Sequence, residues 1–312
     1  MECRAGRARV ECRAGRARAE WLAQRARVEW LAGRARAALR AGRARLGLRA
    51  GRARAGSRAA YGRDGHRADG IRGGSRALKR FWEHAVAVRR PEGGHAVLLD
   101  GKPLRLPGGA PLATASAALA GAIAEEWQAA GGAKGGEMTL EAVPLTRLLG
   151  SAQDRVAADP AAMVAGLAKY GETDLLCYRA EDTALAELQA RDWQPWLDWA
   201  ARVHGAPLGV TAGLMPVAQP PESLAALRGA VAAHGAEELA ALGVAVPALG
   251  SLVLGLALSA GEVTAERAHA LSVLDETWQE ERWGLDGEAT ARRARAAADV
   301  ALAGRFLALV RS

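Results

Sequence analysis

Residues 84–106, HAVAVRRPEGGHAVLLDGKPLRL, decide how the front of this chain folds. Small and β-branched residues alternate over 84–90, and a second apolar run covers 95–99. The segment PEGG follows the first run and the dipeptide DG follows the second, and both contain residue types that tight turns require. Because a third alternating stretch, LRL, precedes a run rich in proline and glycine, we predict a three-stranded antiparallel meander.

A helical periodicity replaces the strand pattern after the meander. Leu119, Ile123 and Trp127 lie four residues apart and therefore form one apolar helix face. Either Thr114 or Ser116 can cap this helix. Further helices are predicted over 192–199, 223–234, 247–260, 264–283 and 287–310.

Strands followed by helices are typical of an α+β fold with segregated halves. We therefore predict a β-rich N-terminal domain over 78–150 and a mostly α-helical C-terminal domain over 151–312. Most tryptophans of this body are predicted as core residues. Tryptophan is also enriched at binding hot spots, so we expect one or two of them at the surface.

Residues 1–77 form a low-complexity extension, in which nine-residue units containing Arg-Ala-Arg repeat in tandem. Residues 1–80 hold 23 Lys and Arg against 6 Asp and Glu, whereas the remaining residues hold 19 against 28. Nine residues make about two and a half helical turns, so the repeat builds no continuous apolar face. We predict a disordered basic extension, and the alternatives are a nucleic-acid-binding arm or a mitochondrial transit peptide.

The composition argues against several classes of protein. Half of the 312 residues are hydrophobic, but no long uninterrupted apolar run occurs, so we expect no membrane insertion. Cys177 is the one cysteine of the body, which favours a reducing compartment. The Ala/Arg/Gly-rich composition favours a bacterial cytoplasm, and a eukaryotic source would imply the mitochondrial matrix. We expect no secretory signal peptide, and no nucleic-acid binding by the acidic body.

Two carboxylates near a cysteine are the candidate for catalysis. Glu172 and Asp174 flank Thr173, and Cys177 follows shortly after. Paired carboxylates can perform acid–base chemistry, which would make the chain a small-molecule enzyme. The same carboxylates can equally cap helices, and a buried thiol without a neighbouring histidine is inert. No histidine pair has metal-ligand spacing and no phosphate-loop motif occurs, so we expect no metal and no cofactor.

An acidic patch lies on the helix predicted over 264–283. Asp275, Glu276 and Glu280 belong to it, and Trp278 belongs to the apolar stripe of the same helix. Glu276 and Glu280 lie four residues apart and repel each other by roughly 0.2–0.5 kcal/mol in an isolated helix. A solvated helix face explains such a patch, and the functional alternative is a docking surface for a basic patch of a partner.

Short motifs along the body match one protein family in the family's own order. They are KRFW at 79–82, DGKPL at 100–104, AEEW at 124–127, VPLTRL at 143–148, YGETDLLCYR at 170–179, WQPWLDWA at 193–200, GSLVL at 250–254, DETWQ at 275–279 and RWG at 282–284. Each motif is weak by itself, but the ordered set is specific. Residues 78–312 therefore resemble the assembly chaperones that hold the free alpha subunit of the F-type ATP synthase.

The resemblance implies binding to the newly made alpha subunit, shielding of its beta-contacting surface, and no enzymatic activity. It gives weight to Trp127 and to one of the two neighbouring acidic residues of the DETWQ motif. The predicted partner-binding residues are Asp275, Glu276, Glu280, Trp278 and Trp283. The predicted structural residues of the family motifs are Trp127, Glu172, Asp174, Trp193 and Trp196. The repeat over 1–77 has no counterpart in the family.

Overall fold

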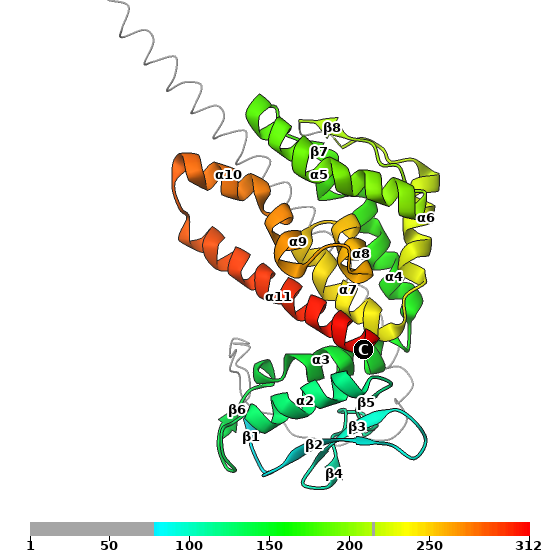
Figure 1. The fold of residues 1–312 in the computed structure, drawn as a ribbon, viewed down its shortest axis with the longest axis vertical. Coiled ribbons are helices and arrows are strands. Elements are labelled where there is room, and N and C mark those ends of the chain that lie inside the picture. The colour runs from blue at the N-terminus through cyan, green and yellow to red at the C-terminus, as the bar shows by residue number, and fades with distance from the viewer. Residues whose placement is uncertain (1–77, 214–215) are drawn as a thin grey trace, which may run out of the picture. The chain divides into compact units, whose positions relative to one another are not determined.

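The computed structural model describes residues 78–213 and 216–312. The predicted repeat extension over 1–77 lies outside the described residues, as does the nucleic-acid-binding alternative that depends on it. Short strands come first along the described chain and helices follow (Figure 1), so the predicted α+β class is confirmed. The division of the body into two domains at residue 150 stays a prediction.

Two small antiparallel sheets form the β-rich front of the described chain. The larger has the strand order β2-β3-β4, with β5 also paired to β3, and the smaller pairs β1 with β6. The strands are β1 (Leu78–Lys79), β2 (Ala85–Arg89), β3 (His95–Leu99), β4 (Lys102–Pro103), β5 (Ala113–Thr114) and β6 (Glu137–Met138). The predicted three-stranded meander is therefore confirmed, and β5 is a strand that the sequence pattern did not indicate.

The third strand of the meander lies earlier than the alternating LRL stretch. Asp100 and Gly101 have positive φ angles of 47° and 78°, which a two-residue hairpin turn requires. The chain therefore reverses at once, and Leu99 pairs with Lys102. The LRL stretch follows β4, and the N–H of its first residue, Leu104, still donates to a carbonyl of β3.

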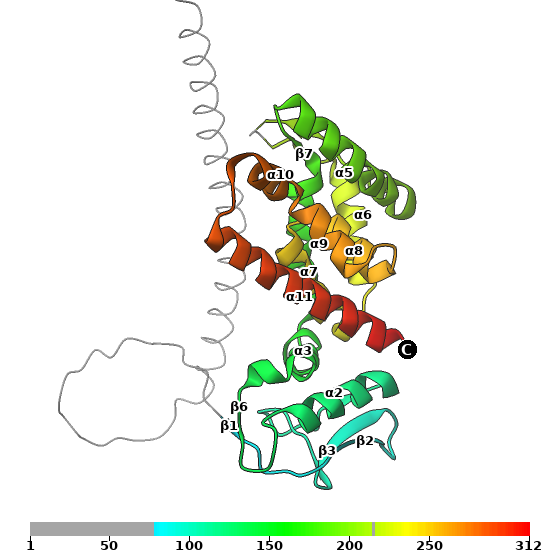
Figure 2. The ribbon, with the colours of Figure 1, turned by 60° about the vertical axis from the view of Figure 1, so that its left-hand side comes forward.

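Helix α2 (Ala117–Ala129) packs against β2 and β3 of the larger sheet (Figures 1 and 2). Ser116 caps it, because the Ser116 hydroxyl accepts from the Leu119 N–H at 3.0 Å. Leu119, Ile123 and Trp127 are all buried, so the predicted helix and its apolar face are confirmed.

Helices make up most of the remaining chain. They are α3 (Pro144–Ser151), α4 (Pro160–Ala168), α5 (Thr183–His204), α6 (Pro221–Ala232), α7 (Ala236–Leu249), α8 (Leu252–Ala260), α9 (Ala265–Ser272), α10 (Leu274–Trp283) and α11 (Gly287–Arg311). Shorter turns are the 3-10 segments η2 (Leu140–Ala142), η4 (Lys169–Thr173) and η5 (Leu175–Cys177) and the π-helical segment η3 (Ala152–Val156). The strands β7 (Tyr178–Arg179) and β8 (Thr211–Ala212) pair in parallel.

Three of the predicted helices differ from the observed ones by more than two residues. The helix predicted over 192–199 begins earlier, because the Asp182 side chain caps α5 there. The helix predicted over 247–260 is two helices, since Gly250, with a φ of 64°, ends α7 before α8 begins. The helix predicted over 264–283 likewise divides into α9 and α10.

The interior of the helical part centres on α7 and α8, with α11 packed against α7 and α9 (Figure 2). Gly255 lets α8 approach α7 closely, because a Cβ there would lie 2.4 Å from Cγ2 of Val246. The Ser116 hydroxyl donates to the Leu309 carbonyl at 2.5 Å, which joins the start of α2 to the end of α11. Within residues 78–213 and 216–312, no helix has both the length and the apolar character that crossing a membrane requires.

Candidate partner-binding site

Asp275, a residue of the predicted acidic patch, contacts the neighbouring helix α5. Its carboxylate accepts a hydrogen bond from Nε2 of Gln189 at 2.7 Å. Gln189 lies in α5, is 1% exposed, and accepts from the Ala180 N–H at 2.7 Å through its other amide atom. Burial raises the pKa of Asp275 to about 6. Asp275 therefore joins α10 to α5 through Gln189, and its role as a partner-binding residue stays a prediction.

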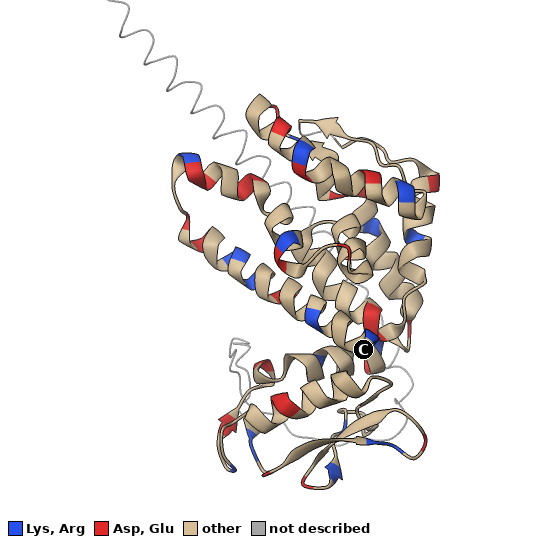
Figure 3. Ribbon diagram, viewed as in Figure 1, with Lys and Arg blue, Asp and Glu red and all other residues tan. Residues whose placement is uncertain are grey.

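Glu276 and Glu280 share a cation from the neighbouring helix. Arg293 of α11 donates to Oε2 of Glu280 at 2.6 Å and lies 3.6 Å from Oε2 of Glu276. The repulsion expected between the two glutamates in an isolated helix is therefore offset by Arg293. Glu280 is mostly covered, whereas the side chain of Glu276 remains 44% exposed. Figure 3 shows acidic segments in α10 and several basic segments along the neighbouring α11.

The turn between α10 and α11 exposes two large apolar side chains. Trp283 is 49% exposed and Leu285 is 81% exposed, and Gly284 between them has a φ of 91°. In the adjoining helix Glu281 is exposed, and Glu276 has the partly exposed side chain described above. We call Glu276, Glu281, Trp283 and Leu285 the α10–α11 corner. Sequence reasoning missed Leu285, although a lone apolar residue in a polar turn after glycine is a signal that was present in the sequence.

Trp278 supports this corner from within α10. The Arg282 guanidinium carbon lies 3.4 Å from the centroid of the Trp278 ring, a cation–π arrangement. The rings of Trp278 and Trp283 meet edge to face with centroids 6.1 Å apart. Because two neighbours hold Trp278, its ring orients Trp283, and Trp283 presents the exposed aromatic surface.

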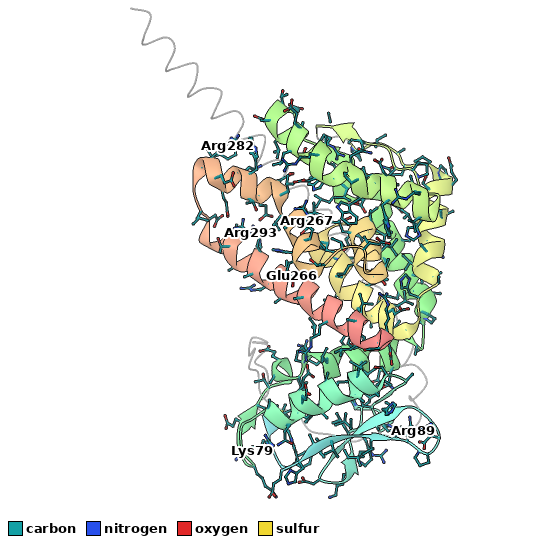
Figure 4. All side chains as sticks on the ribbon, viewed as in Figure 1. Lys79, Arg89, Glu266, Arg267, Arg282 and Arg293 are labelled. Atoms are coloured by element: carbon teal, nitrogen blue, oxygen red, sulfur yellow. The ribbon has the colours of Figure 1, made fainter. Side chains whose placement is uncertain are left out.

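A groove of about 440 Å³ lies along the inner side of α10, with further walls from α5, α9 and α11. Trp278 and Arg293 line it, together with the ion pair between Asp192 and Arg267 at 3.4 Å. Figure 4 shows Arg267, Arg282 and Arg293 on three different helices around this region. The lining carries both signs of charge, so it suits polar contacts with a protein better than capture of an apolar small molecule.

Trp127 lies away from the α10–α11 corner and has a packing role. Its indole Nε1 donates to Oγ1 of Thr146 at 2.8 Å, and its carbonyl accepts from Nε1 of Trp82 at 3.0 Å. The two tryptophan rings are 4.9 Å apart between centroids. Glu126 accepts from the Leu145 N–H at 2.8 Å. The family motifs around 82, 127 and 145 therefore hold each other in place.

Arg80 is a buried cation that sequence reasoning did not single out. It is 4% exposed, and its guanidinium donates to five backbone carbonyls at 2.6–3.2 Å. Those carbonyls belong to Trp82, Glu83, Gln128, Ala130 and Gly132. Two of them, those of Gln128 and Ala130, lie at the C-terminal end of α2, where unpaired carbonyls favour a cation. Arg80 thus links the segment between β1 and β2 to the C-terminal end of α2.

The residues of the catalytic alternative do not form a common site. Asp174 is fully buried and accepts from the N–H groups of Leu176 and Val253 at 3.1 and 3.0 Å, so it caps η5 and the start of α8. Cys177 is buried, and burial raises the pKa of its thiol. Glu172 is exposed. No group of three or more His, Cys, Asp and Glu side chains in the described chain is placed to hold a metal ion.

The tryptophans of α5 differ in their surroundings. Trp193 is 1% exposed, donates from Nε1 to the Leu271 carbonyl at 3.0 Å, and lies under the Arg179 guanidinium. Trp196 is half-buried. Trp193 therefore joins α5 to α9 as a core residue.

This chain is similar to a chaperone family and to three solved chains. Residues 79–201 match the family model described as ATP12 chaperone protein. The chain is 46% identical to Atp12 from Paracoccus denitrificans, with a TM-score of 0.71, over 75% of this chain and 98% of that one. A mutant of the same Atp12p matches equally well. Atu1473, a putative chaperone from Agrobacterium tumefaciens, is 39% identical with a TM-score of 0.69, over 74% of this chain and 86% of that one.

Proposed function

This chain belongs to the ATP12 chaperone family of non-enzymatic ATP synthase assembly factors, and on that premise we propose that it binds the free alpha subunit of the catalytic sector. In this proposal the chaperone covers the alpha-subunit surface that later contacts a beta subunit. Release follows when the beta subunit takes its place.

The observation that carries the proposal is the α10–α11 corner. A tryptophan and a leucine are exposed there, and the helix that leads to them carries the acidic side chains of Glu276 and Glu281. Partly exposed aromatic anchors surrounded by polar residues are typical of binding hot spots. The acidic border would align a partner that carries a complementary basic patch, since such charges set encounter rate and register.

A holding role also suits the energetics of an orphan subunit. A subunit that lacks its partner exposes an apolar interface, and such surfaces aggregate. The chaperone must bind more strongly than the subunit associates with itself, and more weakly than the beta subunit binds. A small corner with two apolar anchors supplies moderate affinity of this kind.

We infer that binding takes place in the bacterial cytoplasm, where a newly made catalytic-sector subunit is accessible. The free, buried thiol of Cys177 is compatible with a reducing compartment. Cell fractionation with an antibody against the chain would check the location, and recovery from the periplasm would contradict it.

The binding test uses the full chain and purified alpha subunit in biolayer interferometry. Leu285→Ala and Trp283→Ala are each expected to weaken binding by about tenfold or more, because truncating a hot-spot anchor costs more than 1–2 kcal/mol. Leu140→Ala is the matched control, because Leu140 is a 50% exposed leucine in η2. It is expected to change binding by less than about twofold. Glu281→Lys is expected to lower the association rate, most clearly at low salt.

The outcomes distinguish an error in the proposed function from an error in the proposed binding surface. If the wild-type chain does not bind the alpha subunit, the proposed function is wrong. If it binds but Leu285→Ala and Leu140→Ala behave alike, the function stands and the α10–α11 corner is not the binding surface.

A further inference from the structure

Strand β2 has one open edge in the described chain. It pairs with β3 along one side, and no described strand pairs with its other side. Two backbone hydrogen bonds, one just before and one just after β2, show which of its residues point their backbone groups toward β3. The Asp100 N–H donates to the His84 carbonyl, and the Arg90 N–H donates to the Gly94 carbonyl, both at 2.9 Å. In an antiparallel pair such bonded positions recur at every second residue. The even-numbered residues of β2 therefore bond to β3, and the odd-numbered ones point their N–H and C=O groups outward.

One of the outward positions is already capped by a side chain. Oε1 of Gln128 accepts from the Ala85 N–H at 2.8 Å, and Nε2 of Gln128 donates to the Glu83 carbonyl at 3.0 Å. Gln128 thus closes the first part of the edge in the way a neighbouring strand would. Ala87 and Arg89 follow, both are exposed, and the described chain supplies no partner for their outward backbone groups. An exposed row of this kind is a template for another strand.

A shallow hollow lies next to this edge, on the face of the sheet that α2 does not cover. Its volume is about 320 Å³, and Val88, Ala96 and Leu98 from β2 and β3 form its apolar floor. Val86, on the same face, is 48% exposed. An extended segment alternates its side chains between two faces, so a segment paired to β2 would place every second side chain over this hollow.

The border of the hollow is basic. Arg89, Arg90 and Arg105 line it, whereas Glu92, which is paired with Arg90, is the acidic residue of its lining. Arg89 is exposed and, in the part of the chain that the structure describes, forms no ion pair or side-chain hydrogen bond (Figure 4). An occupant with an acidic side chain opposite Arg89 would complement this border.

We propose that the open edge of β2 accepts an extended segment of the client protein as an added strand, with an apolar side chain over the hollow and an acidic one beside Arg89. Backbone hydrogen bonds to Ala87 and Arg89 hold the segment, and the hollow and the arginine select its side chains. The identification of the client as the alpha subunit rests on the proposed function. The β2 edge is then a second contact, built from different residues than the α10–α11 corner.

The experiment measures binding of purified alpha subunit to the full chain and two pairs of variants. Ala87→Pro removes the outward N–H, and proline is tolerated on an edge strand where that group faces solvent. Ala87→Ser keeps the N–H and is the matched control. Arg89→Glu reverses the charge beside the hollow, and Lys79→Glu makes the same change at an exposed residue of β1. Circular dichroism checks that each variant is folded.

We expect Ala87→Pro and Arg89→Glu to weaken binding by about tenfold or more, with Ala87→Ser and Lys79→Glu within about twofold of wild type. Hydrogen exchange of the wild-type complex gives an independent measurement, since an added strand slows exchange of the Ala87 and Arg89 amides. If the alpha subunit binds wild type and all folded variants equally and these amides stay unprotected, the strand addition is refuted while the proposed function stands. If wild type does not bind, both are refuted.

Discussion

Replacing Asp275 by Asn is expected to make the protein more stable at neutral pH, although this residue belongs to a family motif. Burial raises the pKa of the Asp275 carboxyl from an ordinary 3.8 to about 6. The folded protein therefore holds this proton more tightly than the unfolded chain does. The stability that this proton supplies is fully present below about pH 4 and is lost as the pH rises through 6. At neutral pH the ionised carboxylate costs the folded state free energy.

The size of this cost follows from the pKa. A pKa that is higher by about two in the folded state corresponds to about 2.7 kcal/mol. The residue keeps partial contact with solvent, and screening by that solvent reduces the figure to about 1–2 kcal/mol. Asparagine keeps an oxygen that can accept from Nε2 of Gln189, so the hydrogen bond at 2.7 Å is retained without the charge.

The assay is urea unfolding followed by tryptophan fluorescence at pH 4, 5, 6, 7 and 8. Asp275→Asn is expected to exceed wild type in unfolding free energy by about 1–2 kcal/mol at pH 8, and the gain should fall to roughly half of that value at pH 5 and disappear below about pH 4. Glu276→Gln is the matched control, because Glu276 is the neighbouring carboxylate and remains 44% exposed. Its effect should stay within about 0.5 kcal/mol at every pH.

Two results would refute this reasoning. The first is a loss of stability on Asp275→Asn at pH 8, which would mean that the charge itself holds α10. The second is a gain that does not depend on pH, which would mean that burial does not control this carboxyl.

Two further changes test the packing. Arg80→Met should destabilise the protein by about 3–5 kcal/mol and lower the Tm on the order of 10 °C, because five carbonyls lose their donor. Lys79→Met, at an exposed residue, is the control. A Tm change for Arg80→Met no larger than that of the control would contradict the role of Arg80. Gly255→Ala should destabilise by about 1–3 kcal/mol, since its Cβ would lie 2.4 Å from Val246. Gly229→Ala, in α6 with no atom within 4 Å, should be neutral or stabilising by up to about 1 kcal/mol, and equal effects of the two substitutions in thermal denaturation would count against close packing of α7 and α8.

Local patterns predicted the β-rich front well because they depend on near neighbours. The turn at Asp100-Gly101 and the alternating runs on either side of it specify a meander without reference to the rest of the chain. The strand β5 escaped prediction because two residues carry no periodicity, and their pairing with β3 arises from contact with a strand already in place. The open edge of β2 was invisible for the same reason, since an unpaired edge is a property of the sheet.

The candidate site was predicted in composition but not in geometry. The acidic helix and its tryptophans were found from spacing, and Trp283 is indeed exposed. Asp275 was assigned to the same docking surface, which stays a prediction, and its hydrogen bond to Gln189 of α5 could not be foreseen from spacing. Leu285 was overlooked, because its exposure depends on the turn that α11 makes after α10.

The sequence alone determined the family and the α+β order of the elements. The family follows from motifs in a fixed order, and the elements follow from local periodicity, and both can be read along the chain. Only the tertiary structure decided which partners Asp275 and Glu276 have. Neighbouring residues on a helix point about 100° apart, and which direction is inward depends on where α5 and α11 lie. In this protein α5 supplies Gln189 for Asp275 and α11 supplies Arg293 for Glu276, and neither contact can be read from the residues next to them in the sequence.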